Sequence, residues 1–355
     1  MRWTPLRLST PVAQHVFGAR RIPDLLGHTG LPEGRIAETW ECSDVDGKSG
    51  VVQDGPLAGR SLRDLATEHP DELVGRGWRG PRFPVLTKFI DGAGMLPVHL
   101  HADDEAARRL EGQPNGKTEA WHILWAAPGV TALVGLKPGV ERGALREALF
   151  RQEWDAVMRR IPVRPGETIY VPGGTLHSFG PDTLIYEIEQ TSDIQQHAMP
   201  WKMEDGSEVP PDQRRSNIGK LLEELRPEPR PHSQPPLRLP ENDGAERLFC
   251  CAGPHFALER WGVAADAALA HAFDHAIILS NVGAPAAVRS GGWSGTLGRA
   301  ETLLLPAALG RVEVAGPADL LAGYLPDLER DIRAPLAGAG YGPEAVAALG
   351  EGLGG

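Results

Sequence analysis

Cysteine, tyrosine and long hydrophobic runs are all scarce in this sequence. The 355 residues include 3 cysteines and 4 tyrosines, and no apolar run is long enough to cross a bilayer. Cys42, Cys250 and Cys251 show no CxxC spacing, which predicts buried thiols rather than a disulfide or zinc framework. The stretch 1–16 has no apolar core of signal-peptide length. We therefore expect a protein of the reducing cytoplasm.

An excess of basic residues is also lacking. The 36 lysines and arginines are outnumbered by 47 aspartates and glutamates, giving a net charge of −11. Nucleic acids and anionic membranes are bound by basic surfaces, so neither is an expected partner. A small molecule, even an anionic one, remains compatible because one pocket can be locally basic. The sequence leaves open whether the protein is a monomer or a homodimer.

Glycine and proline, by contrast, are abundant, with 43 and 32 residues. Such a composition favours many short strands over a helical bundle. Alternating apolar patterns predict strands, and an Ala/Leu/Arg/Glu-rich segment predicts one or two helices over 143–160, with a further helix at 217–226. The strands are expected at 83–91, 95–101, 119–126, 130–136, 167–171 and 183–189.

Six prolines between positions 227 and 240 predict a surface linker, followed by a second series of short strands. We therefore predict a mainly β protein with two barrels in tandem and a few helices in insertions and in the linker. No sequence repeat relates the two halves. The expected division is an N-terminal metal-binding domain over 1–205, a helix and linker over 206–244, a metal-free second barrel over 245–335 and a flexible tail over 336–355.

Three histidines and one glutamate occur in an order that predicts a metal site. His99 and His101 flank one residue of a strand, so their rings share a face. His177 ends the run GETIYVPGGTLH, which resembles the second motif of the cupin (double-stranded β-helix) proteins position for position. Glu119 opens the strand where the first cupin motif has its carboxylate. Three imidazoles and one carboxylate suit a divalent metal, with zinc expected and iron, manganese or nickel as alternatives.

The other histidines are expected to be structural. His122 is predicted to pack outside the first barrel. His271 and His275 do not form an HExxH motif, and His255 stands alone in an apolar strand, so no second metal cluster is expected among them.

Around these ligands the chain resembles the class I mannose-6-phosphate isomerases. The resemblance extends from about residue 5 to residue 325 and is carried by VHLHADD (98–104), GKTEAW (116–121), VPGGTLH (171–177) and EIEQTSD (187–193). It implies that His101, Glu119 and His177 hold zinc, with His99 where other members have glutamine. It also implies that Lys117 and Glu187 line the pocket, where Lys88 can add positive charge for the substrate.

Two positions depart from the family pattern. Pro97 stands where the family has a serine that helps to hold phosphate. His197 stands where it has an arginine credited with catalysis and phosphate contact, and a neutral imidazole is no substitute for a guanidinium fork. These changes affect substrate recognition while the metal ligands are retained.

The sequence therefore supports three hypotheses. The first is an aldose–ketose isomerase of the mannose-6-phosphate isomerase type, with Glu187, Lys117 and His197 as catalytic candidates and Lys88, Lys117 and Glu187 as substrate-binding ones. The second is a diverged cupin metalloenzyme for an unphosphorylated substrate, either an isomerase or an oxygen-activating enzyme. The third is a non-catalytic sugar-binding cupin. Fold alone does not choose among them.

Overall fold

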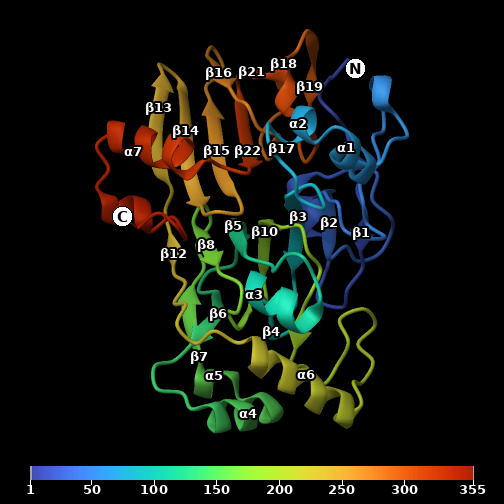
Figure 1. Ribbon diagram of the computed structural model, residues 1–355, viewed down its shortest axis with the longest axis vertical. Helices are drawn as coiled ribbons and strands as arrows, with labels where there is room; N and C mark the ends of the chain where they lie inside the picture. The colour runs from blue at the N-terminus through green and yellow to red at the C-terminus, as the bar shows by residue number, and fades with distance from the viewer. Residues whose placement is uncertain (1, 355) are drawn as a thin grey trace.

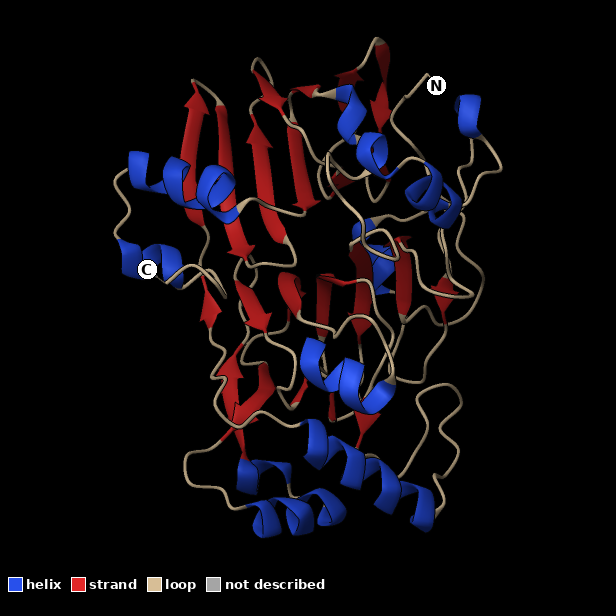
Figure 2. Ribbon diagram, in the orientation of Figure 1, coloured by secondary structure: helices blue, strands red, loops and turns tan. Residues whose placement is uncertain are grey.

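Two antiparallel β barrels stacked along the long axis make up most of the molecule (Figures 1 and 2). The computed structural model describes residues 2–354. The N-terminal barrel occupies the lower half of the view, and the C-terminal barrel, drawn in orange, occupies the upper half. The prediction of a mainly β cupin-like fold is confirmed. No helix between residues 2 and 354 combines the length and the apolarity that a membrane span requires.

The N-terminal barrel is built from a seven-stranded and a five-stranded sheet. The larger sheet has the order β1-β2-β3-β10-β5-β8-β12, and the smaller has the order β11-β4-β9-β6-β7. The strands are β1 Val12–Ala13, β2 Glu38–Cys42, β3 Val85–Gly92, β4 His99–Leu100, β5 Glu119–Ala126, β6 Thr131–Leu136, β7 Met158–Pro162, β8 Thr168–Val171, β9 His177–Ser178, β10 Thr183–Gln190, β11 Gln196–His197 and β12 Ser233–Gln234.

The C-terminal barrel repeats this topology strand for strand. Its sheets have the orders β13-β14-β15-β22-β17-β20 and β16-β21-β18-β19. Strands β13 to β22 therefore correspond in sequence order to β1 to β10, and only β11 and β12 of the first barrel have no counterpart among the described strands. Its strands are β13 Leu237–Asn242, β14 Ala245–Ala252, β15 Ala257–Val263, β16 Ala268–Ala272, β17 Ile277–Asn281, β18 Ala286–Ser290, β19 Trp293–Leu297, β20 Thr302–Leu305, β21 Arg311–Ala315 and β22 Ala318–Tyr324.

The register of the strands matches as well. Lys88 of β3 pairs with Trp40 of β2, and the counterpart strand places Glu259 of β15 opposite Phe249 of β14. In both barrels the ladder shifts directly after this pair. The repeat is therefore structural, although residues at equivalent positions differ in charge and size.

The helices lie around the outside of the barrels, and the two longest of them lie at the lower end of the molecule in Figure 1. The α-helices are α1 Leu62–Glu68, α2 Pro70–Leu73, α3 Asp104–Ala106, α4 Arg142–Arg151, α5 Trp154–Val157, α6 Pro211–Glu224, α7 Ala334–Gly338 and α8 Pro343–Ala347. Single turns of 3₁₀ or π geometry are η1 Ile22–Leu26, η2 Gly55–Leu57, η3 Ala107–Glu111, η4 Ala307–Leu309 and η5 Leu328–Arg333.

Three local expectations differ from the structure. The one or two helices expected over 143–160 form as α4 and α5 but end at Val157. Residues 158–162 instead pair as β7 with β6, because this edge of the small sheet offers backbone partners. The second half of the expected linker forms β12 and β13. The tail expected to be flexible contains α7 and α8 and buries four apolar side chains in the C-terminal core: Leu336, Val346, Leu349 and Leu353.

The barrels meet through the outer faces of their large sheets. Phe89 and Tyr186 of the first barrel share one apolar cluster with Cys250 and Leu258 of the second. The hydroxyl groups of Tyr186 and Ser280 lie 3.0 Å apart within it. All three cysteines are free and buried, as predicted, and burial raises the pKa of the Cys250 thiol to about 12.

The last turn of α6 carries a buried carboxyl group whose charge opposes folding. Glu224 is 3% exposed, and Gln196 Nε2 donates to Glu224 Oε1 and to Glu111 Oε1 at 3.3 and 3.2 Å. Burial and the Glu111 carboxylate raise the pKa of Glu224 to about 8. The native state therefore holds an extra proton, and stability should fall as pH rises from about 4.5 towards 8.

Replacing Glu224 with glutamine should remove this pH dependence. We expect Glu224→Gln to be more stable than the wild type by about 1–2 kcal/mol at pH 8.5 and nearly equal to it at pH 5. Urea unfolding at the two pH values measures this. The exposed neighbour Glu223 provides the control, since Glu223→Gln should change stability little at either pH. Equal stability of Glu224→Gln and wild type at pH 8.5 would contradict the assignment.

Candidate metal centre

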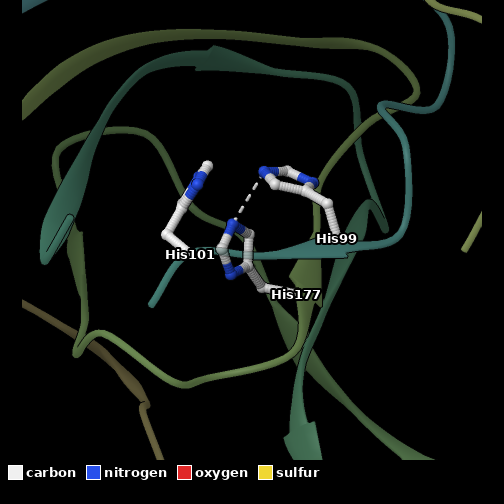
Figure 3. Close-up of side chains that lie close together, drawn as sticks. All are labelled: His99, His101 and His177. Carbon is white, nitrogen blue, oxygen red and sulfur yellow. Dashed lines mark hydrogen bonds between the residues drawn. The ribbon is translucent and has the colours of Figure 1, made fainter. Parts of the chain in front are cut away.

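Three histidine rings converge inside the N-terminal barrel (Figure 3). His99 lies on β4 directly opposite His177 of β9, and His101 follows two residues later on the same face as His99. One nitrogen of each ring lies within 4.8 Å of the others, and the Nε2 atoms of His99 and His177 are 2.9 Å apart. The rings of His99 and His177 are therefore positioned by strand pairing, and His101 lies directly after the end of β4.

Backbone carbonyls orient all three rings in the same way. The Nδ1 atoms of His99, His101 and His177 lie 2.7, 2.7 and 2.8 Å from the carbonyl oxygens of Pro97, Ile194 and Thr175. A carbonyl can only accept a hydrogen bond, so each Nδ1 carries the proton. Each Nε2 is thereby left as a lone pair aimed into the barrel, which is the arrangement found around metal-binding histidines.

Glu119 adds a carboxylate to this set. As the first residue of β5 it lies 3.2 Å from His101 Nε2 through Oε2 and 3.2 Å from His177 Nε2 through Oε1. Trp121 Nε1 donates to Oε1 at 2.9 Å and fixes the orientation of the carboxylate. The four side chains are between 1% and 7% exposed.

Burial and neighbouring charges shift the pKa values of His99, His101 and Glu119 towards their metal-binding forms. Burial, with the Lys117 charge, lowers the pKa of His101 to about 4, and burial and the other two rings lower the pKa of His99 strongly. Burial alone would raise the pKa of Glu119, but Lys117 and the histidines hold it well below its ordinary value. Neutral imidazoles and an ionised carboxylate are the forms that bind a cation.

The donor set therefore fits one divalent metal ion. Lys117 Nζ lies 3.0 Å from His101 Nε2, whereas the Nε2 atoms of His99 and His177 face each other at 2.9 Å; a cation between the three rings and the carboxylate would satisfy all of these donors at once. The structure brings together all four residues that the sequence indicated. No second group of potential ligands occurs in the C-terminal barrel within the described range 2–354.

Glycines of the motifs bring the ligand-bearing segments together. A Cβ atom on Gly116 would lie 2.5 Å from the carbonyl oxygen of Ala102, and one on Gly173 would lie 2.7 Å from the Cα atom of Asp103. Both glycines therefore allow their loops to pack against the chain that follows His101. Gly174, at a φ of +83°, donates its N–H to the His101 carbonyl at 2.7 Å.

Two lysines and two further glutamates form a buried cage beside the ligands. Lys117 Nζ lies 3.0 Å from Glu119 Oε2 and 2.7 Å from Glu189 Oε2. Lys88 Nζ lies 2.9 Å from Glu189 Oε1 and 3.2 Å from Glu187 Oε2. Glu189 thus bridges the two ammonium groups. Sequence reasoning missed it, although Glu187 and Glu189 are two apart in one strand and so share a face.

The remaining sequence candidates are placed as follows. His197 lies on β11 opposite His99, so both side chains project from the same face of the sheet. The Nδ1 atom of His197 is buried with no hydrogen-bond partner among the described residues, and burial lowers its pKa. His122 faces away from the barrel interior, as predicted, and its Nδ1 lies 2.9 Å from Thr168 Oγ1.

Comparisons with known proteins agree with this geometry, although no family model matches the chain. The probable mannose-6-phosphate isomerase GmuF of Bacillus subtilis is 33% identical over 189 residues, which is 53% of this chain and 59% of that protein. The mannose-6-phosphate isomerase ManA of the same organism is 28% identical over 327 residues, which is 92% of this chain and all of that protein.

Solved structures give the same result for the fold. The crystal structure of the mannose 6-phosphate isomerase from Bacillus subtilis superposes with a TM-score of 0.81 at 23% identity, covering 91% of this chain and all of that one. A mannose 6-phosphate isomerase bound with zinc and yttrium superposes with a TM-score of 0.71 at 15% identity over the same share of this chain.

Proposed function

We propose that this chain, which is similar to mannose-6-phosphate isomerases in sequence and in fold, is a metal-dependent isomerase that interconverts an aldose and a ketose of the mannose type. One observation carries the proposal. The inward set of three imidazoles and one carboxylate adjoins the cage of Lys88, Lys117, Glu187 and Glu189 inside a single barrel.

The reaction requires a proton to move between C1 and C2 and negative charge to be stabilised on the substrate oxygens. When bound, a divalent metal supplies a Lewis acid that polarises those oxygens. Glu187 is our candidate for the group that moves the proton, since its carboxylate faces the interior beside the ligands. The Lys117 ammonium, held by two carboxylates, is placed to donate a hydrogen bond to a substrate oxygen. Glu189 positions both lysines.

We propose zinc as the physiological metal. Neutral imidazole nitrogens with one carboxylate oxygen suit zinc, and a structural relative contains it. Iron, manganese and nickel also accept such donors, so the metal has to be identified by its content in the purified protein.

The test of the function is isotope incorporation during turnover. Incubating the protein with mannose or mannose 6-phosphate in D₂O should place solvent deuterium on the carbon next to the carbonyl of the ketose product, and chelation should stop it. A protein that binds metal but exchanges no carbon-bound hydrogen of either sugar would support the non-catalytic, sugar-binding alternative instead.

A second candidate substrate, an unphosphorylated sugar, is favoured by the charges around the cage. Lys88 and Lys117 are each paired with two carboxylates, so neither is a free phosphate ligand. Pro97 offers no hydroxyl group, and the lowered pKa of His197 leaves its ring neutral at pH 7.5. We therefore propose weakened use of mannose 6-phosphate relative to free mannose.

Restoring a guanidinium at position 197 should strengthen phosphate recognition. A hydrogen bond to a charged group contributes about 1.5–3 kcal/mol, so His197→Arg should raise kcat/KM for mannose 6-phosphate by roughly 10- to 100-fold. The value for free mannose should stay the same, which makes free mannose the internal control. His197→Gln, which adds no charge, should not show the gain. Efficient, phosphate-selective turnover by the wild type would show that another residue already binds the phosphate.

A further inference from the structure

The open end of the C-terminal barrel contains a cavity of about 400 Å³. Its wall combines aromatic and charged side chains from β14, β16, β22 and the segment 328–338 that follows β22. The lining residues used below are Arg247, Phe273, Asp274, His275, Tyr324 and Arg330.

This cavity lies at the barrel end that corresponds to the metal centre. In the first barrel Glu119 of β5 pairs with Glu189 of β10, and in the second barrel Ile277 of β17 pairs with Tyr324 of β22. Ile277 thus occupies the position of the ligand Glu119, and Tyr324 occupies the position of Glu189. The first position is apolar in the second barrel, whereas the second position is still polar. The second barrel thus has a polar cavity at the equivalent place, and no group of potential metal ligands lies there among residues 2–354.

The base of the cavity is a buried hydrogen-bonded network. Arg247 donates to Glu259 through Nε and Nη2 at 2.6 and 2.7 Å. Trp261 Nε1 donates to the same carboxylate at 2.8 Å, and the Tyr324 hydroxyl donates to it as well. All four side chains are at most 8% exposed. Apolar residues of similar size are often as stabilising as a buried ion pair, so stability alone does not account for charges at the base of a cavity.

The two arginines that line the cavity are already paired with carboxylates. Arg247 also donates to Glu241 at 3.0 Å, and Arg330 donates to Asp274 and Asp331 at 2.6 and 2.7 Å. Both guanidinium groups are therefore already paired, and two of their carboxylate partners, Asp274 and Asp331, also line the cavity, which disfavours a phosphate or carboxylate ligand.

The aromatic side chains of the cavity wall suit a neutral ligand that has both apolar and hydroxyl-bearing surfaces. The His275 ring stacks on Tyr324 at 4.8 Å between centroids, and Phe273 adds a further apolar face. His275 Nδ1 lies 3.2 Å from Asp274 Oδ1, while its buried Nε2 has no hydrogen-bond partner among the described residues. Aromatic surfaces beside polar groups that form hydrogen bonds match a ring of C–H groups that carries hydroxyls.

We propose that the C-terminal barrel binds a neutral monosaccharide or polyol in this cavity. The site is separate from the metal centre, and its occupation does not depend on the reaction proposed for the first barrel. A pocket of this volume lies within the range of small-molecule sites.

Saturation-transfer NMR on the full-length protein tests the proposal in a His177→Ala background, which disables the metal centre. Mannose or mannitol should bind with a Kd on the order of millimolar. Adding His275→Ala should weaken this binding at least about tenfold, whereas adding His255→Ala, outside the cavity in the same barrel, should leave it unchanged. His275→Phe keeps the stacked ring and should weaken binding less than His275→Ala does.

Three results would overturn the proposal. One is the absence of neutral sugar or polyol binding in His177→Ala, and another is undiminished binding after both His275 substitutions in folded protein. The third is tighter binding of mannose 6-phosphate than of mannose in His177→Ala, because the paired charges of the cavity exclude an anion. Circular dichroism verifies that each variant is folded.

Discussion

Replacing His177 with alanine should yield a folded protein that has lost nearly all of its metal and its isomerase activity. The His177 ring contributes one of three inward lone pairs, and its Nε2 also contacts His99 and Glu119. Loss of an outer-shell partner of a metal ligand costs roughly 10–100-fold in affinity or activity, so the loss of a ligand should exceed this. We expect His101→Ala to behave in the same way.

Metal analysis by mass spectrometry after gel filtration measures the first effect. Chelation should lower the melting temperature of the wild type, since bound metal stabilises the folded state, but should not change that of His177→Ala. His232→Ala, at an exposed position remote from the ligands, is the matched control and should retain metal and activity. Full metal occupancy in both ligand variants would mean that the metal is held elsewhere.

The metal centre could be predicted from the sequence because its ligands follow from strand geometry. His99 and His101 share a face through simple alternation, and the glycines and proline before His177 mark a turn between strands. The cage was predicted only in part, since Lys88, Lys117 and Glu187 were named and Glu189 was not. The role of Glu189 as a bridge depends on the pairing of β10 with both β3 and β5, which no local pattern reveals.

The structural repeat was hidden for a related physical reason. A barrel requires apolar and polar residues to alternate, but it does not require particular residues at each position. Lys88 and Glu259 occupy equivalent registers with opposite charges, as Glu119 and Ile277 do with different polarity. The end of the helix at Val157 was missed because residues 158–160 are helix-compatible, and the pairing of this segment with β6 is a tertiary effect.

Replacing Glu187 with glutamine should abolish proton transfer without removing the metal. The amide has nearly the size of the carboxylate but cannot take a proton from carbon. General-base catalysis typically contributes 10²–10⁴-fold, so we expect kcat to fall by about that factor. The Glu187 carboxylate bonds to Lys88 rather than to the three histidines, which predicts unchanged metal content.

Steady-state kinetics with metal analysis on the same preparation separates proton transfer from metal binding. A Glu187→Gln variant that keeps its metal, has a KM within a few-fold of the wild type and incorporates no deuterium in D₂O would identify Glu187 as the base. Glu147→Gln, on an exposed turn of α4, controls for the loss of a charge. Near-normal turnover by Glu187→Gln would move the role to Glu189, the other carboxylate that faces both lysines from the same strand.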